Sequence, residues 1–290
     1  MSIVKRVFEN GRFVHAMRLF GILTLLFLIH CQAPDERFSP YLILYAFDAE
    51  GVLLSQQMTI TDSLTTLGRT AYVGQLSGKE IVLAESGIGM TNAAMSAQYL
   101  IDQFHPKAVI FSGIAGAIDT SVHIGDIVIC SDWITHDYGY YGKGGFKPSA
   151  IQYFDNSADS LTTSRCFTVD PVLLAAANQL ANDDLALERI GDRTPSLLVG
   201  GTGVSGNSFI DSQGKRLWLN QQFSAMVTDM ESAAVAQVCV VNGLPFIIFR
   251  SASDLAGGSG SETAREEMGQ FFEIAAVNSS TLVIKLLRSL

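Results

Sequence analysis

Charged residues are scarce in this chain of 290 amino acids, and basic ones are the scarcer kind: there are 19 Lys and Arg against 28 Asp and Glu. The formal net charge is −9. Nucleic-acid binding depends on clustered Lys and Arg, so this balance and the lack of a basic patch argue against a nucleic-acid partner. Only 16% of the residues are charged and 48% are hydrophobic, which is ample material for a large core.

Cysteine is also rare, and its four positions form no pattern. Cys130, Cys166 and Cys239 show no CxxC or Cys/His spacing, so the sequence predicts neither a metal site nor a disulfide framework. Cys130 and Cys239 lie in apolar runs and are expected to be small core residues. A phosphate-binding P-loop and a Ser-His-Asp order with a nucleophile elbow are lacking too. No cofactor is expected.

The N-terminal apolar run is too short to cross a membrane. Residues 19–29 are about eleven apolar residues, whereas a spanning helix needs about 20. With Arg18 before it and Cys31 after it, the run fits the core of a signal peptide, and Met17 is a possible start.

The residues Leu28-Ile29-His30-Cys31 resemble a bacterial lipoprotein signal, in which the Cys becomes lipidated, with His30 at a position where a small residue is usual. We therefore expect residues 1–31 to direct export, to the periplasm or to a membrane through Cys31. An uncleaved hydrophobic N-terminus is the alternative.

Beyond a linker at 32–40, strand-like apolar runs alternate with helix-like stretches. The predicted strands are 41–47, 71–76, 81–84, 108–111, 127–130, 196–199, 225–227 and 246–249, and the predicted helices are 92–104, 171–180, 230–241 and 262–287. This alternation predicts a single α/β domain over 41–290, with a central mixed, mostly parallel sheet flanked by helices. Residues 131–154, rich in Gly, Tyr and Asp, are expected to form a long loop that shapes a pocket or a subunit contact.

The stretch 227–254 contains the densest group of candidate site residues. Asp229 and Glu231 open a predicted helix, and the strand 246–249 leads into Arg250-Ser-Ala-Ser-Asp254. Ligands bind at the carboxyl ends of strands in open α/β sheets. A helix start stabilises negative charge, so both acids are expected to be ionised acceptors suited to a polyhydroxyl ligand such as ribose. The alternative is that Asp229 only caps the helix and Asp254 only occupies a turn.

Two glycine-rich segments offer other interpretations. Residues 201–206 match GxGxxG after a strand, and Asp229 lies 23 residues beyond Gly206, which favours a nicotinamide-dependent enzyme. Against this, residues 207–211 are a poor opening for the required helix, and the first predicted strand lacks the fingerprint. The turn Gly87-Ile88-Gly89 either lets a ligand approach backbone amides or is a packing turn.

Six blocks occur in an order that resembles one family. They are YAFDAEGVLL (45–54), ESGIGMTNAA (85–94), FSGIAGAI (111–118), IGDIVI (124–129), GVSGNSFID (203–211) and DMESAA followed by LPF, an Arg and Ser-Asp (229–254). Over nearly all of 41–290 the chain resembles the nucleoside phosphorylase and nucleosidase superfamily. It is most similar to the methylthioadenosine/S-adenosylhomocysteine nucleosidases and to the plant bark storage proteins that share their fold.

The resemblance implies a purine nucleosidase that hydrolyses an N-glycosidic bond, in a homodimer whose neighbouring subunit helps to form the 5′ end of the pocket. It assigns catalysis to Asp254, which protonates purine N7, and to Glu50, which activates water. Glu231 would hold the ribose hydroxyls, with Met230 against the sugar. Phe209 would lie on the purine face, and the backbone at Ile210 would read the base edge. Arg250 would neutralise or orient the acids. The remaining substrate-binding positions are Asp229, Ser253, Gly113 and Ile114. His136 and Asp137 resemble a Tyr-His-Asp patch, with His136 expected to be structural.

Two alternatives stay open within the family. Phosphorylases of this fold carry an Arg and a Ser where this chain has Phe111 and Ile114, and a Gly-rich turn where it has 46–50, so water is the expected nucleophile and a phosphorylase is the alternative. Ile114 also replaces the Ser of the nucleosidases. The second alternative is therefore a non-catalytic storage or nucleoside-binding protein of the same fold. Retention of Glu50, Glu231 and Asp254 together favours the enzyme.

Overall fold

The computed structural model describes residues 39–290, apart from 157, 182, 184 and 262. The proposed export segment 1–31, with Cys31, lies outside the described residues. Within the described part no helix is both long and apolar enough to cross a membrane.

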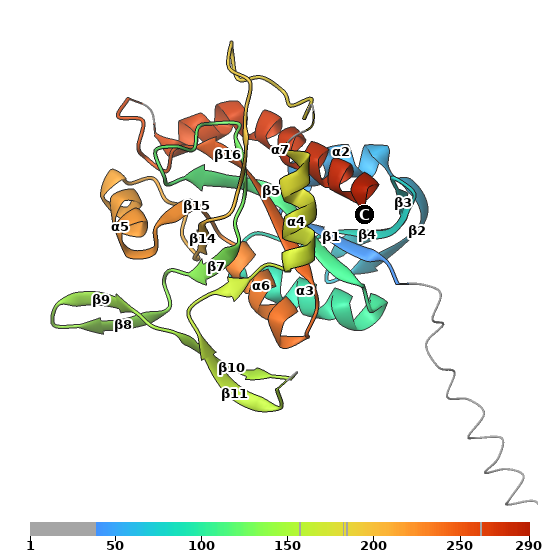
Figure 1. The fold of residues 1–290 in the computed structure, drawn as a ribbon, viewed down its shortest axis with the longest axis horizontal. Helices are drawn as coiled ribbons and strands as arrows, with labels where there is room; N and C mark the ends of the chain where they lie inside the picture. Colours follow the sequence, from blue (N-terminus) through green and yellow to red (C-terminus); the bar gives the residue numbers. More distant parts are fainter. Residues whose placement is uncertain (1–38, 157, 182, 184, 262) are drawn as a thin grey trace, which may run out of the picture. The chain divides into compact units, whose positions relative to one another are not determined.

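A large mixed sheet forms the centre of residues 39–290 (Figure 1). Its strands are β1 (Tyr41–Tyr45), β2 (Thr59–Thr66), β3 (Arg69–Leu76), β4 (Lys79–Glu85), β5 (Ala108–Ala117), β6 (Ile127–Ile129), β7 (Asp132–Thr135), β12 (Phe167–Thr168), β13 (Leu197–Val199), β14 (Thr202–Ser205), β15 (Ala225–Asp229) and β16 (Phe246–Asp254). Two separate hairpins pair β8 (Gly139–Gly142) with β9 (Gly145–Pro148) and β10 (Ile151–Asp155) with β11 (Ser160–Ser164). The helices are α2 (Asp48–Gln57), α3 (Met90–Phe104), α4 (Pro171–Leu180), α5 (Gln213–Phe223), α6 (Ser232–Val241) and α7 (Ala264–Ser289).

The strand order is β12-β7-β14-β15-β5-β1-β4-β3-β2, with β16 beside β5 and β6, and β13 beside β6. The central pairs β1/β4, β1/β5 and β5/β16 are parallel, whereas β15 meets β5 antiparallel. Figure 1 shows α2 and α7 on one side of the sheet and α3 and α6 on the other. Strands covered on both faces are mostly apolar, as in the first half of β16, and all nine residues of β16 are buried, including its polar end. The predicted α/β domain with a mixed, mostly parallel sheet is confirmed.

Both long central strands extend further than their apolar runs. β5 continues from Phe111 to Ala117, and β16 continues through Arg250 to Asp254. The polar residues that the sequence places after a strand are therefore the end of that strand. Their backbone groups pair across the sheet, with Arg250 opposite Gly113 and Asp254 opposite Gly116, after a register shift between Ala252 and Asp254.

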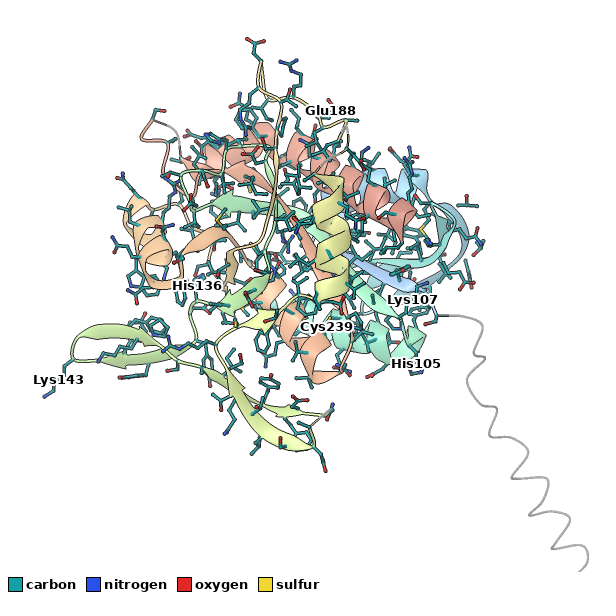
Figure 2. The ribbon with its side chains drawn as sticks, in the orientation of Figure 1. His105, Lys107, His136, Lys143, Glu188 and Cys239 are labelled. Carbon is teal, nitrogen blue, oxygen red and sulfur yellow. The ribbon has the colours of Figure 1, made fainter. Side chains whose placement is uncertain are left out.

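The long loop predicted at 131–154 is wrong. This segment contains β7, β8, β9 and the start of β10, and its two hairpins project from the sheet in Figure 1. Figure 2 shows Lys143 at the tip of the β8–β9 hairpin. All four residues of β8 are exposed, so its sequence has no buried face and no hydrophobic alternation to indicate a strand.

The glycine-rich segment 201–206 is not a dinucleotide-binding turn. Its residues Thr202–Ser205 form β14, which lies between β7 and β15 and is followed by a loop rather than by a helix. Gly203 lies against the indole of Trp133, where a Cβ would overlap the ring. Close packing therefore accounts for this glycine, and the nicotinamide interpretation is wrong.

Candidate active site

A cavity of about 260 Å³ opens where β5, β15 and β16 end, and it is lined by the four acids Glu50, Asp229, Glu231 and Asp254. They come from four places in the chain: the first turn of α2, the end of β15, the residue before α6 and the end of β16. The fold thus brings together the two predicted catalytic residues and two of the predicted ligand-binding acids.

Arg250 lies beneath this cavity and connects three of the acids. Its side chain is fully buried on β16, and its Nε is 2.7 Å from Asp229 Oδ2. Its terminal nitrogens lie 3.8 Å from Glu50 Oε1 and 3.6 Å from Glu231 Oε2. Removing one partner of such a buried ion pair leaves an uncompensated charge and is strongly destabilising. The predicted role of Arg250 in neutralising the acids agrees with this geometry.

Glu50 is held by backbone amides at the start of α2. Its Oε2 accepts a hydrogen bond from the Ala46 amide at 2.6 Å, and its Oε1 accepts one from the Ile114 amide at 2.8 Å. Burial raises the pKa of Glu50 above its ordinary value, and Arg250 and the amides oppose that rise. A carboxylate with a raised pKa is a stronger base toward a bound water molecule than an exposed one.

Glu231 faces the cavity from the N-cap position of α6. Its Oε1 accepts a hydrogen bond from the Gly89 amide at 2.9 Å. The turn at Gly87–Gly89 therefore presents an amide to Glu231. Burial, together with the neighbouring Asp229, raises the pKa of Glu231 to about 7. Burial thus works against the ionised form that is expected for Glu231 at the helix start, while Arg250 and the Gly89 amide favour it.

Asp229 is the last residue of β15, and its carboxylate is occupied by protein groups. It accepts hydrogen bonds from the hydroxyls of Ser205 and Ser232 and from the amide of Ser232 at 3.2 Å, in addition to its ion pair with Arg250. Asp229 thus binds amides at the start of α6, but Glu231 holds the N-cap position, and Asp229 also pairs with Arg250 and lines the cavity.

Asp254 occupies the end of β16 and is almost completely buried. Burial raises its pKa to about 6, although the Ala256 amide and the Ser253 hydroxyl, each 2.9 Å from a carboxylate oxygen, oppose the rise. Gly116, its partner on β5, leaves the space that its Oδ1 needs, because a Cβ there would come within 2.8 Å of that oxygen. Asp254 is therefore a carboxyl group that keeps its proton to a higher pH than an exposed aspartate does.

The other predicted ligand positions surround these acids. Phe209 and Met230 line the cavity, and Phe209 is 45% exposed at its edge. Ile210 lines a smaller recess that continues past Asp254. Ile114 lines the cavity and donates its amide to Glu50. Gly113 does not line it; a Cβ at Gly113 would overlap the guanidinium of Arg250, so its role is to make room.

The structure corrects one sequence-based placement, that of Phe111, and agrees with another, that of His136. Phe111 is not at the end of β5 but in its buried middle, where its ring lies 4.2 Å from Cζ of Arg250. His136, labelled in Figure 2, follows β7, does not line the cavity, and is buried with neither ring nitrogen hydrogen-bonded. Its expected structural role is consistent with this position.

The sequence analysis missed cavity residues that come from α7. Arg265 and Met268 line the cavity from the first turns of this helix. A signal was present, because Thr263 and Glu266 form a capping box and so mark the helix start two residues before Arg265. Within the described residues, no group of three or more His, Cys, Asp or Glu side chains is arranged to hold a metal ion.

Known proteins are similar to this chain in sequence and in fold. The Phosphorylase superfamily model matches residues 40–288. A 5′-methylthioadenosine/S-adenosylhomocysteine nucleosidase of Staphylococcus haemolyticus is 34% identical over 249 residues, which cover 86% of this chain and 99% of that protein. A nucleosidase of the same description from Staphylococcus epidermidis is 33% identical over 255 residues.

Solved structures agree with these relatives. The Neisseria meningitidis nucleosidase in complex with methylthio-immucillin-A has a TM-score of 0.71 and 29% identity, over 86% of this chain and 99% of that one. The Colwellia psychrerythraea nucleosidase in complex with adenine has the same TM-score and identity, over 87% and 97%. Because the family model spans nearly all of the described residues and the relatives exceed 30% identity over almost their whole length, this chain belongs to the phosphorylase superfamily.

Proposed function

We propose that this protein is a purine nucleosidase that hydrolyses the N-glycosidic bond of nucleosides such as methylthioadenosine and S-adenosylhomocysteine. The observation that carries the proposal is the placement of Asp254, Glu50 and Glu231 around one cavity, with the pKa of Asp254 raised by burial to about 6. The relatives, which are nucleosidases by name, support the same substrate class.

Breaking an N-glycosidic bond gives the sugar the character of a cation, and the base is a poor leaving group. One carboxylic acid must therefore protonate the leaving group while another activates water, as in the hydrolysis of glycosides. Asp254 is the acid, because its raised pKa keeps a proton available for N7 of the purine. Glu50 is the base, and its negative charge also favours the sugar cation.

The remaining groups bind and orient the nucleoside. Glu231 accepts hydrogen bonds from the ribose hydroxyls, and Met230 packs against the sugar. Phe209 covers the face of the purine, and the backbone beside Ile210 reads the edge of the base in the recess past Asp254. These roles are supported by the positions of Glu231, Met230 and Phe209 in the cavity lining and of Ile210 in the lining of the recess.

Water, rather than phosphate, is the proposed nucleophile. A phosphate ion needs cations or free amides around it. Arg250 forms ion pairs with Asp229, Glu50 and Glu231, so its charge is already neutralised. The Ile114 amide donates its hydrogen bond to Glu50 and is not free to bind an anion. Among the described residues that line the cavity, the remaining cation is the exposed Arg265. A phosphate beside Glu50 would also place two negative charges together.

The test is to incubate the purified protein with methylthioadenosine, S-adenosylhomocysteine, adenosine and inosine, each with and without phosphate. Chromatography then separates the free base from the sugar product. We expect equal rates of base release in both buffers and a free ribose, or its 5′-substituted form, as the second product. Activity that requires phosphate and yields a ribose 1-phosphate would establish a phosphorylase instead.

A further inference from the structure

Glu267 is a buried carboxylate that the proposed reaction does not use. It lies in the first turn of α7 with only 3% of its surface exposed. Its Oε2 accepts a hydrogen bond of 2.8 Å from the amide of Leu255. Leu255 directly follows Asp254, so Glu267 holds the backbone at the point where β16 ends.

This hydrogen bond belongs to the turn that aims the Asp254 carboxyl group. The β5–β16 pairing shifts register just before Asp254, and the chain then leaves the sheet. Of the next two amides, that of Leu255 binds Glu267 and that of Ala256 binds Asp254 itself at 2.9 Å. Without Glu267, the Leu255 amide would lose its partner, which is unfavourable for a donor that is largely shielded from water. Glu267 therefore stabilises the one backbone conformation that presents Asp254 to the cavity.

Glu267 also acts on Asp254 through its charge. Glu267 on α7 and Asp211 before α5 are the charged groups that raise the pKa of Asp254. The other charged residues that line the same cavity are Arg265 on α7, Asp229 at the end of β15, Glu50 on α2 and Glu231 before α6. Burial is the largest cause of the raised pKa of Asp254, and the negative charges of Glu267 and Asp211 raise it further. A nearby carboxylate disfavours the ionised form of its neighbour, and both groups are buried, so solvent screens their repulsion only weakly.

We propose that Glu267 is a positioning residue that fixes the Asp254 carboxyl group and favours its protonated form. The inference rests on the proposed function, because it is the protonated form that donates to the leaving base. It adds a residue that does not touch the substrate and acts through the catalytic acid.

Two substitutions separate the two effects. Glu267→Gln keeps an oxygen that can accept from the Leu255 amide but removes the charge. We expect the pKa of Asp254 to fall by about half a unit or more, as for a single charge at close range in a partly buried site. A lower pKa means that the proton is lost at lower pH, so the basic limb of the kcat/KM profile shifts to lower pH by the same amount. Glu267→Ala also removes the acceptor, so its kcat should be lower than that of Glu267→Gln even at pH 5.

The main measurement is an NMR titration of protein labelled with ¹³C at the aspartate side chains, with the Asp254 signal assigned by its loss in Asp254→Asn. The matched control is Glu273→Gln, which removes the same charge from an exposed position further along α7. The control should leave the titration of Asp254 unchanged.

An Asp254 pKa in Glu267→Gln equal to that of the wild type would overturn the inference. The titration needs no turnover and so distinguishes two failures. If the wild type cleaves no nucleoside although the Asp254 pKa falls in Glu267→Gln, the proposed function is wrong and the link between the two carboxyl groups stands. If the wild type cleaves nucleosides but neither the titration nor the pH profile moves, the link is wrong and the proposed function stands. Circular dichroism of each variant confirms that it is folded.

Discussion

Asp254 is the residue on which the proposed chemistry depends most directly. Asn has nearly the same shape but carries no acidic proton, so Asp254→Asn should bind nucleosides and fail to protonate the leaving base. General acid catalysis contributes about two to four powers of ten, so we expect kcat to fall by at least about a hundredfold. Single-turnover base release and calorimetric binding measure the two effects separately. A variant with more than about a tenth of the wild-type rate contradicts the assignment of Asp254 as the acid.

The same substitution should stabilise the protein at neutral pH. The pKa of Asp254 is about 6 in the folded protein against an ordinary 3.8, so the folded state holds the proton more tightly. The stability linked to this proton is fully present below about pH 4 and is lost as pH rises through 6. Asn is neutral throughout. At pH 7.5 we expect Asp254→Asn to exceed the wild type by up to about 3 kcal/mol in free energy of unfolding.

Urea denaturation at pH 4 and at pH 7.5 checks this expectation. The difference between the two proteins should shrink toward zero at the lower pH. A variant that is less stable than the wild type at pH 7.5 would show that the Asp254 carboxylate makes favourable contacts that outweigh its burial.

For the individual residues, the sequence analysis identified the acids of the site but not their ion pairs and hydrogen bonds. Glu50, Glu231 and Asp254 were found because they match a family motif and stand beside predicted strand ends. The guanidinium of Arg250 contacts three acids, and Glu267 binds the Leu255 amide. Both arrangements join residues from distant parts of the chain, so the sequence alone could not predict them. The raised pKa of Glu231 could not be predicted either, because it follows from burial that only the folded structure shows.

Among the elements, the hydrophobic pattern predicted what is buried and missed what is exposed. The predicted helix 171–180 matches α4 residue for residue, since Asp170 caps it and Pro171 begins it. The core strands β1, β3 and β4 were also found, within a few residues of their ends. The hairpin β8–β9 and helix α5 were missed because few of their side chains face the core. β16 was cut short at Phe249 because its last residues are polar yet buried.

Strand β5 offers a direct test of how closely the elements pack at the site. The Gly113 α-carbon faces Arg250 and Glu50, so a methyl group there would overlap the guanidinium. We expect Gly113→Ala to destabilise the fold by about 1 to 3 kcal/mol, in the range of overpacked core sites, and to reduce activity by displacing Glu50. Thermal unfolding and nucleoside cleavage measure the two effects.

The matched control is Gly269→Ala. Gly269 lies in α7 with open space around its α-carbon, and Ala favours the helix by up to about 1 kcal/mol over Gly. The control should therefore be at least as stable as the wild type. Equal stability of Gly113→Ala and the wild type would show that Arg250 can move aside.

For the whole molecule, we predict export directed by residues 1–31. Expression of the full chain in a Gram-negative bacterium, followed by fractionation, should place the protein outside the cytoplasm. If Cys31 is lipidated, the mature chain partitions into detergent and has a mass above that of the bare polypeptide, and Cys31→Ala abolishes both. Recovery from the cytoplasm with the segment intact contradicts export, whereas a soluble exported form contradicts only the lipid anchor.

We also predict a homodimer that includes the face of α3. Met95 and Tyr99 are exposed apolar residues one turn apart on this helix, and Ile88, just before it, is exposed and also lines the cavity. Analytical ultracentrifugation should give twice the mass of one chain. Met95→Glu should shift the protein toward the monomer, while Leu217→Glu, an exposed apolar position on α5, should not. A monomeric wild type would contradict the prediction.

The ion pairs of the buried Arg250 decide which acidic residues a non-catalytic descendant of this protein would keep. Glu50, Asp229 and Glu231 surround its charge, so a lineage that stopped cleaving nucleosides would still need them to stay folded. Their presence is therefore weak evidence of activity in any relative. Asp254 is not paired with that guanidinium, and the buried negative charge that it acquires when its proton leaves weakens the fold at neutral pH. In a lineage without catalysis, Asp254 should be substituted before the other three acids. The residue at this position therefore distinguishes an enzyme from an inactive storage protein of the same fold.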